Sequence, residues 1–124
     1  MTKTVLIAED SSVIQNLAKK ILQFQNFEIL SAKNGQAVLE LLNDNTIDVI
    51  LMDINMPIMD GMECAREIRH LSNPEKANVP IIAISGNAKG YTMHDFKEVG
   101  FNEYLPKPLN FDSVVELVKK YTNR

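Results

Sequence analysis

Val49-Ile50-Leu51-Met52 is a run of four apolar residues that ends abruptly at Asp53. A short apolar run that contains β-branched side chains and stops at a polar residue predicts a β-strand. Its apolar residues are continuous and do not alternate with polar ones, which is typical of a strand covered on both faces. The stretch therefore predicts a parallel sheet with helices packed against both sides.

The rest of the chain contains further short runs of this kind, and helical segments lie between them. Further short β-rich runs lie at residues 4–8, 27–31, 81–85 and 101–105. Between the runs and after the last one, apolar residues recur at helical spacing, as in the first of these segments: Ile14, Leu17, Ala18, Ile21 and Leu22. Strict alternation of strand and helix predicts an α/β domain over residues 1–124 with five strands and five helices.

Composition narrows the class of protein. The chain has 124 residues, 45% hydrophobic and 23% charged, which excludes a disordered, collagen-like or disulfide-scaffold protein. A formal charge of -3 argues against direct binding to nucleic acid or an anionic membrane. Cys64 is the only cysteine, so no internal disulfide can form, and we interpret it as a core residue. Since no apolar run is long enough for a signal peptide or membrane span, we expect a cytoplasmic protein.

Polar residues of types that bind metals or take part in reactions lie at the ends of four of the predicted strands. Glu9 and Asp10 follow the first strand, Asp53 the third and Ser85 ends the fourth, while Lys107 lies just past the fifth. Ligands of open parallel sheets bind at this carboxyl edge. Clustered carboxylates repel one another unless a cation neutralises them, and their oxygens suit magnesium. With the metal bound, one carboxylate can attack phosphorus while the ammonium and hydroxyl stabilise charge, which predicts phosphoryl transfer to an aspartate.

Each of these residues also has a simpler interpretation. Asp10 can cap the first helix, Asp53 can begin a turn, and Ser85 can hydrogen-bond within its own loop. Lys107 can be an ordinary solvated lysine. For Asp60, which stands before Gly61, we prefer the interpretation as a turn and helix cap. The simple interpretations do not explain why the other residues fall at one edge of the predicted sheet, so together they favour a shared site.

Four ordered motifs carry a resemblance to a known family. They are Val5-Leu6-Ile7-Ala8-Glu9-Asp10-Ser11, Met52-Asp53-Ile54-Asn55-Met56-Pro57-Ile58-Met59-Asp60-Gly61, Ile81-Ile82-Ala83-Ile84-Ser85-Gly86-Asn87-Ala88 and Tyr104-Leu105-Pro106-Lys107-Pro108. From Lys3 to its end the chain resembles a response regulator receiver domain of the chemotaxis-regulator type. The resemblance implies a flavodoxin-like, doubly wound sheet of order 2-1-3-4-5. A free-standing regulator and a receiver cut from a hybrid histidine kinase both remain open.

The resemblance assigns roles to the residues at the strand ends. It implies that Asp53 is the phosphorylated side chain and that Lys107 pairs with the phosphoryl oxygens, next to a cis peptide bond at Pro108. It also implies a set of magnesium ligands: Asp10, Asp53, the backbone carbonyl of Asn55, and Glu9 through a bound water.

The same resemblance implies a switch and its partners. Ser85 and Tyr104 hold the positions of the switch residues, and Asn87 lies where it could help to position a hydrolytic water. A histidine kinase or histidine phosphotransfer protein would donate the phosphoryl group. A downstream protein would bind the face formed by the helix at 90–99, the fifth strand and the last helix. Apart from accepting the phosphoryl group and slowly losing it, the domain would have no enzymatic activity.

Two other functions stay open at the level of sequence. An aspartate-nucleophile, magnesium-dependent phosphatase of the haloacid dehalogenase type would share the first chemical step. Such phosphatases carry a second acid two residues after the nucleophile, whereas Asp53 is followed by Ile54 and Asn55. The other possibility is an interaction module that keeps the fold and is never phosphorylated.

Overall fold

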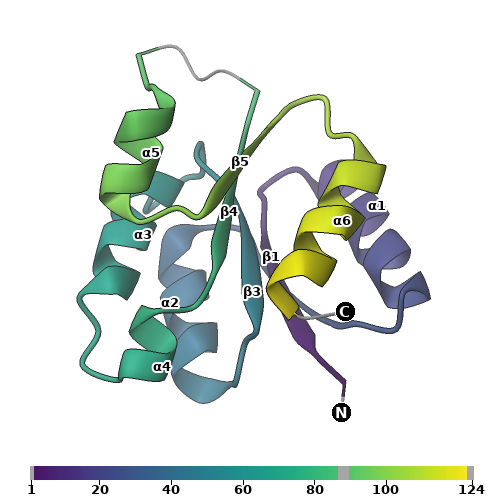
Figure 1. The fold of residues 1–124 in the computed structure, drawn as a ribbon, viewed down its shortest axis with the longest axis horizontal. Helices are drawn as coiled ribbons and strands as arrows, with labels where there is room; N and C mark the ends of the chain where they lie inside the picture. The colour runs from purple at the N-terminus through teal and green to yellow at the C-terminus, as the bar shows by residue number, and fades with distance from the viewer. Residues whose placement is uncertain (1, 87–89, 123–124) are drawn as a thin grey trace.

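A five-stranded parallel sheet forms the centre of the molecule (Figure 1). The computed structural model describes residues 2–86 and 90–122. The strands lie in the order β2-β1-β3-β4-β5, which confirms the expected topology. Their bounds are β1 Thr4–Ala8, β2 Glu28–Ala32, β3 Val49–Asp53, β4 Ile81–Ser85 and β5 Glu103–Pro106.

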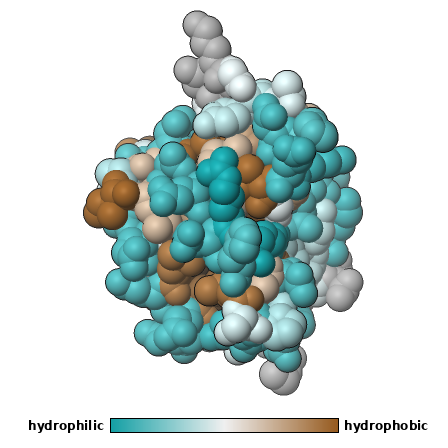
Figure 2. Space-filling view, turned by 90° about the vertical axis from the view of Figure 1, so that its left-hand side faces the viewer, coloured by the Kyte–Doolittle hydropathy of each residue, from teal (hydrophilic) through white to brown (hydrophobic). Residues whose placement is uncertain are grey.

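Helices cover both faces of the sheet. Their bounds are α1 Ser12–Phe24, α2 Gly35–Asp44, α3 Gly61–Arg69, α4 Pro74–Ala77, α5 Met93–Val99 and α6 Phe111–Thr122. In Figure 1, α1 and α6 lie on one side of the sheet, and α2, α3 and α5 lie on the other. Figure 2 views the side of the helices α3 to α5, where hydrophilic side chains cover most of the surface around smaller hydrophobic areas.

The described residues form six helices, so the prediction of five was wrong. The additional helix, α4, is a single turn that precedes β4. Asn73 caps it by accepting hydrogen bonds from the backbone of Glu75 and Lys76, and Pro74 occupies its first turn. Proline is well suited to this position because its fixed φ fits a helix and its missing N–H would have no partner there. A turn this short has no apolar periodicity, which explains why the hydrophobic pattern did not predict it.

Two hydrophobic clusters fill the layers on either side of the sheet. One contains the buried residues of α2 and α3 together with Phe96 of α5, and the other contains those of α1 and α6. Cys64 is fully buried in the first cluster and its thiol donates to the Gly35 carbonyl at 3.4 Å, which confirms its assignment to the core. None of the helices in the described residues is long and apolar enough to cross a membrane.

The buried face of α1 differs from the prediction. Leu17 was expected on the core side, but 47% of its surface is exposed. The buried positions of this helix are Gln15, Ala18 and Leu22. Their spacing of three and four residues is the same helical period, shifted so that an amide replaces an apolar side chain at the end nearest β1.

Candidate functional site

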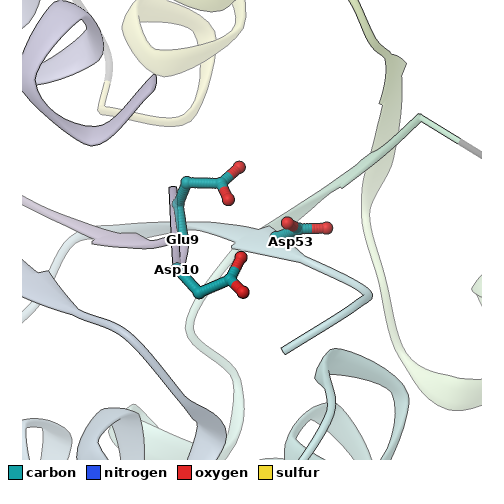
Figure 3. A group of neighbouring side chains, drawn as sticks. All are labelled: Glu9, Asp10 and Asp53. Atoms are coloured by element: carbon teal, nitrogen blue, oxygen red, sulfur yellow. The ribbon is translucent and has the colours of Figure 1, made fainter. Parts of the chain in front are cut away.

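Three carboxylates meet at the carboxyl edge of the sheet (Figure 3). Asp53 is the last residue of β3 and Glu9 is the first after β1, and they are 2% and 1% exposed. Asp10 follows Glu9 and is exposed to solvent. Ligand oxygens of the three side chains all lie within 4.8 Å of one another. The structure thus brings together the three acidic residues that the sequence placed at this edge.

Lys107 reaches into the acidic cluster from the loop after β5. Its Nζ lies 2.8 Å from Glu9 Oε1 and 2.9 Å from Asp53 Oδ2, and its side chain is 21% exposed. Burial by itself would lower the pKa of Lys107, but the contacts with the two carboxylates outweigh burial and raise it. The side chain therefore stays charged, and its interpretation as a solvated surface lysine was wrong.

The two carboxylate oxygens of Glu9 have different partners. Oε2 accepts a hydrogen bond from the backbone of Ser11 at 3.0 Å. Oε1 is buried and forms an ion pair with the Lys107 ammonium at 2.8 Å. Burial raises the pKa of Glu9, with the nearby charge of Asp53 acting in the same direction. In the described residues one ammonium faces three carboxylates, and this excess of negative charge fits a hard cation such as magnesium.

The loop after β3 folds back beneath Asp53. Its Oδ1 accepts a hydrogen bond from the Asn55 backbone at 3.1 Å, which is the turn that the simpler interpretation predicted. Asp60 caps α3 as expected, since its Oδ1 accepts from the backbone of the helix at 2.8 Å. At Gly61, an added Cβ would lie 2.4 Å from the Asp53 carbonyl oxygen, so only glycine lets α3 begin this close to the site.

A strained turn in the same loop was not expected from the sequence. The Met59 N–H donates to the Pro57 carbonyl at 2.7 Å across Ile58, whose φ is 70°. This is a γ-turn with positive φ, a rare conformation that is especially unfavourable for a β-branched residue. The Ile58 side chain is 83% exposed, so packing around it does not explain the conformation. The Met59 carbonyl accepts from the Gly35 backbone at 2.9 Å, which anchors the loop to α2.

Ser85 and Tyr104 lie on the two strands nearest Lys107. Ser85 ends β4 and is 1% exposed, and its carbonyl accepts from the Lys107 backbone at 2.9 Å. Tyr104 is half-buried on β5 and stacks on Phe96 of α5, with ring centroids 4.9 Å apart and planes inclined by 12°. Asn87 lies outside the described residues.

The peptide bond between Lys107 and Pro108 is cis, which confirms the expectation. Gln15 is the residue at this edge that the sequence did not single out. Its buried side-chain amide donates to backbone carbonyls of β1, of β2 and of Glu9. The available signal was its spacing from Ala18 and Leu22, which places a polar side chain on the buried face of α1.

The family model of the response regulator receiver domain matches residues 5–119. The chain belongs to the response regulator receiver family. Its fold of five parallel strands with flanking helices is the fold of the chemotaxis regulators in that family. Receiver domains act in two-component signalling, which agrees with the function that the four motifs implied.

Relatives of this receiver domain include both long kinases and short regulators. It is 35% identical over 119 residues to hybrid signal transduction histidine kinase I of Dictyostelium discoideum, covering 92% of the chain but 7% of the kinase. It is 27% identical over 121 residues to the polar-differentiation response regulator DivK of Brucella ovis, covering 98% of the chain and 97% of DivK. The chain therefore spans a small part of the first protein and nearly all of the second.

A solved receiver structure bears on the metal. The receiver domain of sensor histidine kinase PA1611 from Pseudomonas aeruginosa aligns with a TM-score of 0.88 and 27% identity, covering 100% of each chain. That structure holds a magnesium ion coordinated in its active-site cleft. In the present chain, the carboxyl edge of the sheet carries the acidic cluster of Glu9, Asp10 and Asp53.

Proposed function

We propose that this receiver domain accepts a phosphoryl group on Asp53 from a histidine kinase or histidine phosphotransfer protein in a magnesium-dependent reaction. The placement of Asp53 carries the proposal. Its carboxylate ends the central strand, is 2% exposed, and lies between the ammonium of Lys107 and two further carboxylates. An acceptor aspartate needs these neighbours, because a cationic side chain and a metal must offset the charge of the incoming group.

The acidic cluster would hold the magnesium. Asp10, Asp53 and the Asn55 carbonyl would bind it directly, and Glu9 would bind through a water. The close grouping of the three carboxylates and their excess over the single ammonium of Lys107 among the described residues support this assignment. When bound, magnesium neutralises the charge that the carboxylates and the phosphoryl oxygens share.

Asp53, Asn55 and Lys107 would each have a separate role in the phosphoryl transfer. A carboxylate oxygen of Asp53 forms a bond to phosphorus while the bond from phosphorus to the donor imidazole nitrogen breaks, and its electron pair stays on that nitrogen. The Asn55 N–H, 3.1 Å from Asp53 Oδ1, fixes the rotation of the carboxylate. Lys107 Nζ, 2.9 Å from Oδ2, stands where charge develops on the phosphoryl oxygens.

Output would pass through Ser85 and Tyr104 to a protein-binding face formed by α5, β5 and α6. The added negative charge gives the Ser85 hydroxyl a strong acceptor, which would favour one of two arrangements of the neighbouring elements. The rings of Tyr104 on β5 and Phe96 on α5 are stacked, so a movement of the tyrosine would also shift the helix. A downstream protein that prefers one arrangement then reads the phosphorylation state.

Incubation with magnesium and acetyl phosphate, followed by intact mass measurement, tests the proposal. We expect a single phosphoryl adduct that is lost in Asp53→Asn and in the presence of a chelator. Asp60→Asn is the matched control, because Asp60 caps α3 and should leave the adduct intact. Repeated turnover of phosphate monoesters would instead favour a phosphatase. An absence of adduct with several kinases as donors would favour an unphosphorylated interaction module.

A further inference from the structure

We infer that Gln15 is a positioning residue for the magnesium site, because its buried amide fixes the backbone that carries Glu9 and Asp10. The inference rests on the proposed function and deepens it. It concerns the residue that sets the geometry of the acidic pair and assigns no new ligand to the metal.

Gln15 holds three carbonyls at the ends of two strands. It lies in the first turns of α1 and is 5% exposed. Its Nε2 lies 2.8 Å from the Ala32 carbonyl oxygen and 3.2 Å from those of Ile7 and Glu9. All three partners are acceptors, so the amide must present its NH₂ group to them, and the orientation of the side chain is settled by chemistry. Two hydrogens are thus shared among three carbonyls in a buried position.

These contacts fix the peptide group between Glu9 and Asp10. The Glu9 N–H donates to the Ala32 carbonyl at 3.0 Å, directly beyond the last paired residues of β1 and β2. The Glu9 carbonyl is held by Gln15. With both backbone polar groups of Glu9 bound, the directions of its side chain and of the next one are set by the backbone. Both side chains extend from the end of β1 towards Asp53 (Figure 3).

A structural role alone would have a different signature from a positioning role. Every buried carbonyl needs a donor, so losing Gln15 must destabilise the fold in either case. Only a positioning role also weakens magnesium binding beyond what a loss of stability explains. Residues that orient metal ligands typically change metal affinity by about 10-fold to 100-fold when replaced.

Magnesium titration of the full chain, followed by amide chemical shifts, tests the inference. Gln15→Met keeps the length of the side chain and removes its donors, and we expect it to raise the magnesium Kd by about 10-fold. Leu22→Ala is the matched control: it removes buried apolar contacts from the same face of α1, about two turns beyond Gln15. It should lower Tm and leave Kd within about twofold of wild type. The Glu9 amide should exchange hydrogen faster in Gln15→Met than in Leu22→Ala.

A magnesium Kd for Gln15→Met within twofold of wild type, or an equal weakening in Leu22→Ala, would overturn the inference. If Gln15→Met does not fold, Gln15→Asn provides the same test, because its shorter side chain keeps the amide and cannot reach all three carbonyls. Wild-type protein that neither binds magnesium nor forms the acetyl phosphate adduct would overturn the proposed function as well. Normal binding in wild type and in the Gln15 variants would overturn this inference alone.

Discussion

Replacing Arg69 with methionine tests how much stability one side chain contributes by joining α3 to the segments that precede β4 and β5. Arg69 ends α3, and its guanidinium donates only to oxygen atoms of other segments. Nε and Nη2 lie 3.0 and 2.5 Å from the Gly100 carbonyl, Nη1 lies 2.8 Å from those of Ala77 and Val79, and Nη2 lies 3.1 Å from Asn102 Oδ1. These contacts use all five N–H donors of the group.

Arg69→Met keeps the apolar stem and leaves three backbone carbonyls without this donor. Hydrogen bonds to a charged group contribute about 1.5–3 kcal/mol each, and water can replace part of them at this half-exposed position. We therefore expect the free energy of unfolding to fall by about 3 kcal/mol, equivalent to a Tm lower by roughly 10 °C for a domain of this size. Arg69→Lys should lose about 2 kcal/mol, because an ammonium cannot reproduce the planar fork.

Urea unfolding followed by circular dichroism measures these differences. Arg66→Met is the matched control, since Arg66 lies one turn earlier on α3 with an exposed side chain, and its loss should stay within about 0.5 kcal/mol. If Arg69→Met were no less stable than Arg66→Met, the five hydrogen bonds would add nothing net to the fold, and the reasoning would be wrong.

Two substitutions and one labelling experiment test the site loop and the core. Ile58→Asn should raise the free energy of unfolding by about 1 kcal/mol, since asparagine tolerates positive φ better than isoleucine; an unchanged urea midpoint would mean that the turn is not strained. Gly61→Ala should lower it by about 2 kcal/mol and slow formation of the acetyl phosphate adduct, because the new Cβ would collide with the Asp53 carbonyl. Burial raises the pKa of Cys64 from the ordinary value of 9.0 to about 12, so the stability that comes from burying the neutral thiol is complete below pH 9.0 and is lost as pH rises through 12. Thiol labelling at pH 8 should therefore be slow without denaturant, and rapid labelling of folded protein would contradict this pKa.

The order of residue types along the chain was enough to predict the site. Alternating strands and helices force a parallel sheet, and a parallel sheet gathers its carboxyl ends at one edge. Glu9, Asp10, Asp53 and Lys107 therefore had to lie close together, although Lys107 is 54 positions from Asp53. The strand order and the cis bond before Pro108 were also predicted, by resemblance to the receiver family.

Hydrophobic periodicity and residue type did not predict the positions where a side chain forms contacts between separate segments. Leu17 fits the apolar period of α1, yet the helix is turned so that Gln15 faces the strand ends, where its amide donates to three backbone carbonyls. The single turn α4 has a cap and a proline but no apolar face. Nothing in the residue types predicts that Arg69 would bind carbonyls of other segments.

The sequence by itself determined which residues form the acidic site and at which edge of the sheet they lie. The reason is that the order of strands and helices, and the residue types at the strand ends, can be read directly from it. Only the tertiary structure decided how those residues are bonded. Lys107 bridges Glu9 and Asp53, and burial raises the pKa of Glu9. Burial and charge pairing depend on neighbours from separate strands, so they exist only after the strands have assembled.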